Sequence, residues 1–268
     1  MIGRAASLVL ARSWLAACLA LSLGPLLMVS VFSFNQSRYY SFPITGWTLR
    51  WYGDLFSDER ILSALLVSVA IAACVSVLAT VVGTGFAFAV ARAWPRGRRL
   101  ATVLGFLPLF TPVLVLAVAL QVGFLQVGLP LGFFTVLLGH TIFTTPFVVL
   151  VVLTQLMRYD SRLDAAARDL GAGPVRTLRF VTLPILWPAI RSGALLAFLL
   201  SFNEWAIAFF TGRGFNTMPM LVYSMQRNGL PPSVLAYSCL TIVLSVGVVC
   251  LLLPFMMRVA TSKQKSLP

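Results

Sequence analysis

A series of apolar runs, each long enough to cross a lipid bilayer, constrains the fold of this chain more than any other feature. A transmembrane helix needs about 20 mostly apolar residues. The chain is 59% hydrophobic and only 10% charged over 268 residues, which is more apolar sequence than a soluble core needs. We therefore predict an all-α polytopic membrane protein with a single transmembrane domain, 1–268. The six predicted spans are residues 13–34, 61–91, 100–126, 134–157, 188–210 and 234–257.

Several of these runs exceed the length of a straight crossing, so we expect tilted, kinked or projecting helices. Proline removes a backbone donor and bends a membrane helix. The predicted kink points are Pro108 and Pro112 in the third span and Pro146 in the fourth. The first span also has the basic start and apolar run of a secretory signal, but the apolar run continues to Phe34. We therefore favour an uncleaved first span over a processed signal.

The basic residues set the expected orientation. Cytosolic loops of membrane proteins carry an excess of lysine and arginine. If the N-terminus is cytosolic, 15 of the 20 basic residues fall inside and 5 outside. We therefore predict that both termini and the loop 158–187 are cytosolic. The net charge of +13 is then a topology signal, because nucleic-acid binding would require basic residues clustered with exposed aromatic ones.

Residues 158–191 are the one long polar interruption, with six arginines and three aspartates. Apolar residues at helical spacing predict a first short helix that ends at Gly171: Leu163, Ala166, Ala167 and Leu170. Pro174 suits the first position of a second short helix. Its expected apolar stripe is Val175, Leu178 and Val181, after which Leu183-Pro184 returns to the membrane. We interpret this compact helical segment as one that a partner protein binds. The alternative is a solvated connecting loop.

The sequence lacks the residues of common catalytic and metal sites. Its only lysines are Lys263 and Lys265, so it has no phosphate-binding loop with the required lysine. The single histidine and the four cysteines, which have no paired spacing, indicate neither a metal site nor disulfides. We therefore expect a chain that is not an enzyme and binds no cofactor or metal.

One carboxylate, Glu204, falls inside a predicted span. A charged group within a membrane is costly, and it usually marks a substrate path or a buried pair. Ser201 and Asn203 make the same helix polar toward its outer end. His140 on the fourth span has a similar expected depth, so it could meet Glu204 if the two helices pack side by side. We assign Ser201, Asn203, Glu204 and His140 to a substrate pathway, with a structural His140–Glu204 pair as the alternative.

The spacing within the polar loop matches a known family. Ala165-Ala166-Ala167 is followed by three residues, Gly171, nine residues and Val181-Thr182-Leu183-Pro184. This pattern resembles the cytoplasmic "EAA" loop of permease subunits in bacterial ABC importers of the type I fold, in which Glu-Ala-Ala, three residues, Gly and nine residues precede Ile-x-Leu-Pro. The loop also lies between spans four and five, as it does in that family.

The resemblance covers nearly the whole chain and is strongest to the spermidine/putrescine-type permeases. The sequence departs from the family pattern at two places. Ala165 occupies the position of the loop's glutamate, with Asp164 one residue earlier, and Asn203-Glu204-Trp205 stands where this subgroup often has two adjacent acids. The similar segments are Ser33-Phe34-Asn35, Arg92 to Arg99, Ala166 to Gly171, Ala194 to Asn203, Met218-Pro219 and Tyr223-Ser224-Met225.

The resemblance implies a passive translocation subunit in the bacterial inner membrane. Its implied partners are a second permease subunit, two ATPase subunits that bind ATP and Mg²⁺, and an external solute-binding protein. The implied solute is small and polar or cationic, such as a polyamine; an opine, an aminophosphonate, another amino compound or a metal chelate is the alternative. The implied ATPase-coupling residues are Asp164, Ala165, Ala166, Ala167, Arg168, Asp169, Gly171, Leu183 and Pro184.

Two other classes of protein fit the sequence less well. A secondary transporter would need an ion site of its own, usually charged residues and broken helices near the midplane, and Glu204 near the outer end is thin support for one. A membrane enzyme would need a catalytic cluster, and the sequence suggests none. An ATPase that co-purifies with the chain would separate the importer from both.

Overall fold

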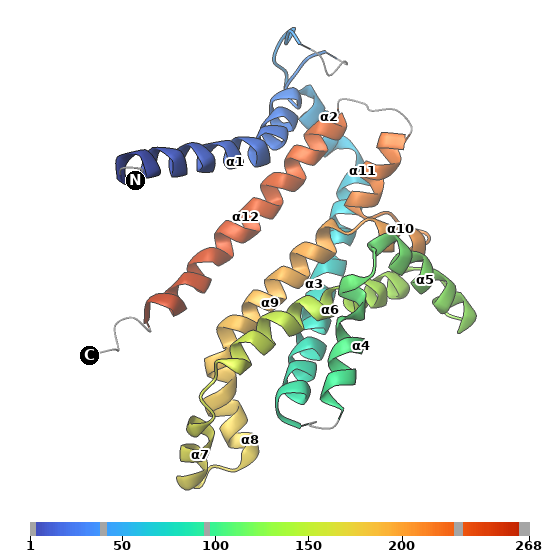
Figure 1. Ribbon diagram of the computed structural model, residues 1–268. Helices are drawn as coiled ribbons and strands as arrows, with labels where there is room; N and C mark the ends of the chain where they lie inside the picture. The colour runs from blue at the N-terminus through green and yellow to red at the C-terminus, as the bar shows by residue number, and fades with distance from the viewer. Residues whose placement is uncertain (1–3, 38–41, 94–96, 228–232, 263–268) are drawn as a thin grey trace. The chain divides into compact units, whose positions relative to one another are not determined.

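The computed structural model describes residues 4–37, 42–93, 97–227 and 233–262, and these ranges are mostly helical (Figure 1). They contain no strand beyond one isolated bridge between Asn35 and Trp47. The all-α prediction is therefore confirmed for the part of the chain that the structure describes. The chain divides into two compact units, residues 1–62 with 222–247 and residues 63–221 with 248–268.

The first unit is organised around the segment that follows α1. The hydroxyl groups of Ser33 and Tyr52 form a 2.7 Å hydrogen bond, and the indole N–H of Trp51 donates to the carbonyl of Asn35 at 2.9 Å. These bonds fasten the end of the first predicted span to a short helix, α2, in the loop that follows it. The helices of this unit are α1 (Arg4–Phe32), α2 (Arg50–Ser57) and, as far as Gly247, α12 (Ser233–Ser262).

The second unit holds most of the remaining helices. Two of its elements, η1 and η2, are π-helical turns that continue neighbouring α-helices. Its elements are α3 (Glu59–Phe88, from Ser63), η1 (Ala89–Ala93), α4 (Arg98–Phe110), α5 (Val113–Gln126), α6 (Phe133–Met157), α7 (Arg162–Asp169), α8 (Pro174–Thr177), η2 (Leu178–Thr182), α9 (Leu183–Asn203), α10 (Ala206–Thr211) and α11 (Met218–Arg227, to Leu221).

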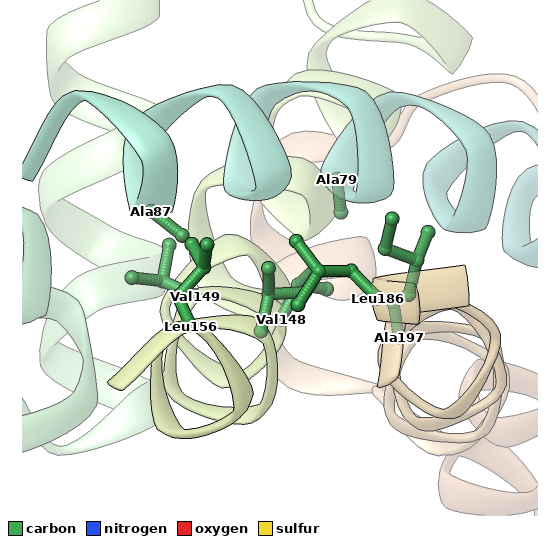
Figure 2. Packing of buried hydrophobic residues seen from close by; sticks show 9 residues of the cluster. Ala79, Ala87, Val148, Val149, Leu156, Leu186 and Ala197 are labelled. Carbon is green, nitrogen blue, oxygen red and sulfur yellow. The ribbon is translucent and has the colours of Figure 1, made fainter. Parts of the chain in front are cut away.

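The core of the second unit forms where α3, α6 and α9 meet. Val148 of α6 is fully buried at the centre of a cluster of small and branched residues from the three helices (Figure 2). Gly83 of α3 and Gly193 of α9 both face Val148, and a Cβ at either position would lie 2.9 Å or 3.1 Å from its side chain. Small residues let membrane helices approach closely, because helix association in lipid depends on tight packing. The serine hydroxyl of Ser76 adds a 2.7 Å bond to the carbonyl of Ala194.

Four helices in the described residues are long and apolar enough to cross a membrane. A fifth crossing results if the bent pair α4 and α5 is one span. The last predicted span falls within α12, whose described apolar part, Ser233–Gly247, is shorter than a full crossing. Six spans and their orientation therefore stay predictions. The four long apolar segments are Leu8–Phe32, Glu59–Arg92, Phe133–Met157 and Pro174–Asn203.

Two of the predicted spans are broken in the structure. The run 100–126 breaks at the predicted kink point Pro112: α4 ends at Phe110, α5 begins at Val113, and the two are bent by 109°, whereas Pro108 lies inside α4. Pro112 lies in the break, as a residue without a backbone donor and with a fixed φ does at a helix start. The run 188–210 is also interrupted, because α9 ends at Asn203 and a separate short helix, α10, follows. In contrast, α6 runs through Pro146 as a single helix.

Candidate functional site

The first candidate site is the α7–α8 segment, which lies beyond one end of α6 and α9 (Figure 1). Gly171 ends α7 with a φ of 83°, in the left-handed region that side chains disfavour. Its N–H bonds to the carbonyl of Arg168 at 2.8 Å, and the N–H of Ala172 bonds to the carbonyl of Ala167 at 3.0 Å. This pair of bonds is the Schellman arrangement, which satisfies the last carbonyls of a helix. The predicted helix end at Gly171 is confirmed.

The second short helix, α8, is continuous with the helix that follows it. Pro174 occupies the first turn of α8, as predicted, but the chain then stays helical through η2 into α9, from Pro174 to Asn203. In η2 the N–H of Leu183 bonds to the carbonyl of Leu178, one residue further back than in an α-helix. The π turn comes directly before Pro184, which has no N–H to continue the α-helical pattern. A continuous helix therefore joins the loop 158–187 to the predicted fifth span, and the residue at which this helix enters the membrane stays a prediction.

The apolar face of α7 is not covered by the part of the chain that the structure describes. Leu163 and Leu170 are exposed, Leu170 by 89%, and Val175 of α8 is 75% exposed. Ala165 and Ala166 are also exposed, and Ala167 is half-buried. Arg168 and Asp169 are exposed beside them, so the end of α7 presents apolar and charged groups together. Exposed apolar residues rimmed by charges are typical of an interaction site.

Asp164 is buried, whereas most other residues of α7 are exposed. It is only 5% exposed, and it is the one buried residue of that helix. Its Oδ2 lies 3.0 Å from a guanidinium nitrogen of Arg92, and its Oδ1 accepts hydrogen bonds from the hydroxyls of Tyr159 (2.6 Å) and Thr182 (3.0 Å). Burial, followed by the hydrogen bond to Asp164, raises the pKa of the Tyr159 phenol. The carboxylate thus faces inward, away from the exposed end of α7.

The second candidate site is the polar patch on α6 and α9. Nδ1 of His140 lies 2.9 Å from Oγ of Ser201, and both residues are buried. Within the described ranges, Nε2 of His140 has no hydrogen-bond partner. Asn203 is exposed, and its amide donates to the carbonyl of Leu199 at 2.9 Å. Of the four residues predicted to form the patch, the structure thus joins only His140 and Ser201 by a direct bond.

Glu204 occupies the break between α9 and α10. Its backbone is extended, and its Oε1 accepts the N–H groups of Ala206 (2.7 Å) and Ile207 (3.1 Å). A carboxylate at this position stabilises the start of α10, because the first N–H groups of a helix have no partner within it. The structure does not join Glu204 to His140. The imidazole of His140 bonds to Ser201 through Nδ1, and its Nε2 has no hydrogen-bond partner among the described residues.

Comparison with known proteins identifies the family. The family model for "binding-protein-dependent transport system inner membrane component" matches residues 79–264, which contain both candidate sites. The chain belongs to this family. It is an inner-membrane permease of the ABC importer type, and the resemblance inferred from the loop is confirmed.

Two curated relatives support this family assignment with more than a third of the aligned residues identical. The permease is 36% identical over 228 residues to the spermidine/putrescine transport system permease protein PotC of Haemophilus influenzae, covering 85% of this chain and 88% of the relative. It is 37% identical over 233 residues to the putrescine transport system permease protein PotI of Escherichia coli, covering 84% of this chain and 82% of the relative.

Solved structures share the fold at low identity. A bacterial ABC transporter that imports the acidic polysaccharide alginate contains a chain 18% identical, with a TM-score of 0.68, covering 96% of this permease and 98% of that chain. The inward-facing MetNI methionine ABC transporter gives 18% identity and a TM-score of 0.65, covering 75% of this permease and 99% of that chain. The fold is thus that of ABC importer permeases.

Proposed function

We propose that this permease is the translocation subunit of an ABC importer that passes a polyamine-like cation from an external binding protein to the cytosol. The observation that carries the proposal is the exposed apolar end of α7, closed by Gly171 and lying beyond the ends of α6 and α9. A chain with its own soluble core would bury such residues, so the segment fits docking to a partner.

In this proposal the chain provides a path but no chemistry. It pairs with a second permease, and two ATPase subunits bind ATP and Mg²⁺ and dock against α7 and α8. Ala165, Ala166 and Ala167 permit a close approach, while Arg168 and Asp169 fix the register by charge. Leu183 and Pro184 lie where the docking segment enters α9. ATP-driven closure then reorients the helices between two rigid-body states.

Polyamine-like cargo is proposed from the relatives and from one carboxylate. The relatives at 36% and 37% identity are named for spermidine and putrescine. In this chain, Glu204 is half-buried and uses Oε1 to cap α10, while Oε2 forms no bond among the described residues. Together with exposed Asn203 and the buried His140–Ser201 pair, this oxygen is proposed to meet a cation in the pathway. An opine, an aminophosphonate, another amino compound or a metal chelate is the alternative cargo.

The test is uptake by the complete complex in proteoliposomes. We expect the chain to co-purify with an ATPase and to import radiolabelled putrescine only when ATP and the binding protein are present. Competition with unlabelled spermidine, an opine or an aminophosphonate identifies the cargo class. Uptake that is abolished by an ionophore and is indifferent to ATP would instead establish a secondary transporter.

A further inference from the structure

The carboxylate of Asp164 bonds α7 to the body of the second unit. Asp164 is the one buried residue of this eight-residue helix, so its carboxylate replaces the apolar contacts that usually attach a helix to a core. Its three donors come from three different segments. Arg92 lies in η1 at the end of α3, Tyr159 lies between α6 and α7, and Thr182 ends η2 at the start of α9.

Those three segments continue the helices that form the core. α3, α6 and α9 pack together at Val148 and its neighbours (Figure 2). One donor lies in the segment that adjoins an end of each of these helices. Two of the donors, Arg92 and Thr182, lie in π-helical turns. A π turn adds one residue to the helical repeat and so redirects the side chains that follow, and such turns are frequent at functional sites.

Arg92 is itself held in place. Its guanidinium lies over the rings of Phe88 and Tyr159, with its central carbon 5.4 Å and 5.3 Å from the two centroids. Cation–π contacts of this kind favour a fixed guanidinium position. The Asp164 side chain is 8% exposed and that of Arg92 is 36% exposed, so the pair is screened from water mainly on the Asp164 side. A buried carboxylate without its partner is strongly disfavoured.

Resting on the proposed importer function, we propose that Asp164 is a positioning residue that transmits the movement of α7 to α3, α6 and α9. The docking surface moves with the ATPase, and the carboxylate makes the three helices move with it as one rigid body. Asp164 therefore acts from inside the protein, while the exposed residues of α7 make the contact with the partner. Without the carboxylate, α7 would follow the ATPase and the helices would lag behind.

The experiment compares ATP hydrolysis with solute uptake in the reconstituted complex. Asp164→Asn preserves size and an acceptor but removes the charge that faces Arg92. We expect hydrolysis to persist and the uptake per ATP to fall about threefold or more, as for residues that modulate coupling energy. Arg92→Gln should give the same fall, and the double variant should be no worse than either single one, because both remove one interaction.

Asp160→Asn is the matched control. Asp160 is an exposed aspartate just before α7, and it pairs with Arg162 at 3.1 Å, on the outside of the protein. It loses the same charge from the same segment, so its uptake per ATP should stay at the wild-type value. An unchanged ratio in Asp164→Asn, at normal complex abundance, would overturn the proposal, as would an equal fall in Asp160→Asn.

Two milder variants cover the case in which Asp164→Asn fails to assemble. Tyr159→Phe and Thr182→Val each remove one hydrogen bond to the carboxylate and leave the Arg92 pair intact. A smaller fall in uptake per ATP is expected in both, and wild-type ratios in both would refute the proposal. Failure of the importer function itself gives a different result, because the wild-type complex would then show no ATP-driven uptake. In that case a spin label at Leu170→Cys, in a cysteine-free background, tests the attachment: it should be more mobile with Asp164→Asn than with Asp160→Asn.

Discussion

Substitutions at Gly171 separate two free-energy costs: the cost of placing a side chain at a positive φ and the cost of a steric clash. The φ of Gly171 is 83°, and apart from its two chain neighbours a Cβ added there would meet no atom of the described residues within 4 Å. Any defect that a substitution causes in the isolated permease must therefore come from the backbone or from charge. Substitutions at this position thus act on the end of α7 without disturbing the core.

The expected magnitudes follow from that geometry. An ordinary L-residue in the left-handed region costs about 1–2 kcal/mol, so Gly171→Ala should weaken the end of α7 by that amount. Asparagine adopts this region several-fold more readily, and Gly171→Asn should cost less, roughly half as much. Aspartate shares that tolerance but places a negative charge at the C-terminal end of a helix, which costs about 0.3–1 kcal/mol more. We therefore expect the Schellman bonds to survive best in Gly171→Asn.

The assay is uptake normalised to complex abundance, measured beside ATP hydrolysis for all three variants. We predict that Gly171→Asp leaves the protein inserted but uncouples it from its ATPase, and that alanine impairs uptake more than asparagine does. A steric block in the partner's groove would give the reverse order, because asparagine is larger than alanine. Normal uptake by Gly171→Asp at normal membrane levels would refute the reasoning altogether.

Three further predictions concern other parts of the chain. A reporter fused near Arg168 should read cytosolic and one near Asp58 external, because 15 of the 20 basic residues fall on the predicted inner side; the opposite result at either site overturns the orientation. Glu204→Gln keeps a capping oxygen for α10 but loses the charge, so uptake per complex should fall for a cationic solute; full uptake with reduced abundance would show a structural role. Gly83→Ala should destabilise the complex by about 1–3 kcal/mol through overpacking, measured by thermal unfolding in detergent, because the added Cβ would lie 2.9 Å from both Cβ and Cγ1 of Val148. Adding Val148→Gly removes both atoms and should relieve part of that loss; additive losses would contradict the contact.

Local signals predicted the helical elements well. The apolar runs located the long helices, because backbone groups in lipid must be satisfied within the segment. Gly171 and Pro174 marked the end of α7 and the start of α8 correctly, since each residue type has a conformational preference that needs no tertiary contact. Pro112 likewise marked a break, but the sequence did not indicate that the bend would reach 109°.

The end of α9 could not be predicted in the same way. No glycine or proline interrupts the chain between Asn203 and Phe210, and the run reads as continuous apolar sequence around one acid. The helix ends because the Glu204 carboxylate takes the first N–H groups of α10, a contact that becomes visible only with the backbone in place. The count of residues along one helix placed His140 and Glu204 at a similar depth, and the structure bonds His140 to Ser201, three residues before Glu204, instead.

The partners of Asp164 were missed for a more general reason. Sequence patterns assume that apolar residues face inward and charged residues face water, and Leu163 and Asp164 of α7 do the opposite, although Arg168 and Asp169 are exposed. Its leucines at 163 and 170 are exposed, and its buried residue is a carboxylate. In the sequence, Arg92 is one of the basic residues behind the predicted orientation and begins a segment similar to the polyamine permeases, and Thr182 is the variable position of Val181-Thr182-Leu183-Pro184. Neither pattern indicates a contact with Asp164, and no pattern singles out Tyr159. A helix with an exposed leucine and a buried carboxylate suits a position between its own chain and a partner. It forms polar bonds to its own chain on one side and apolar contacts with the partner on the other. The exposure of Leu163 beside the burial of Asp164 therefore supports the proposal that α7 links the permease to a partner.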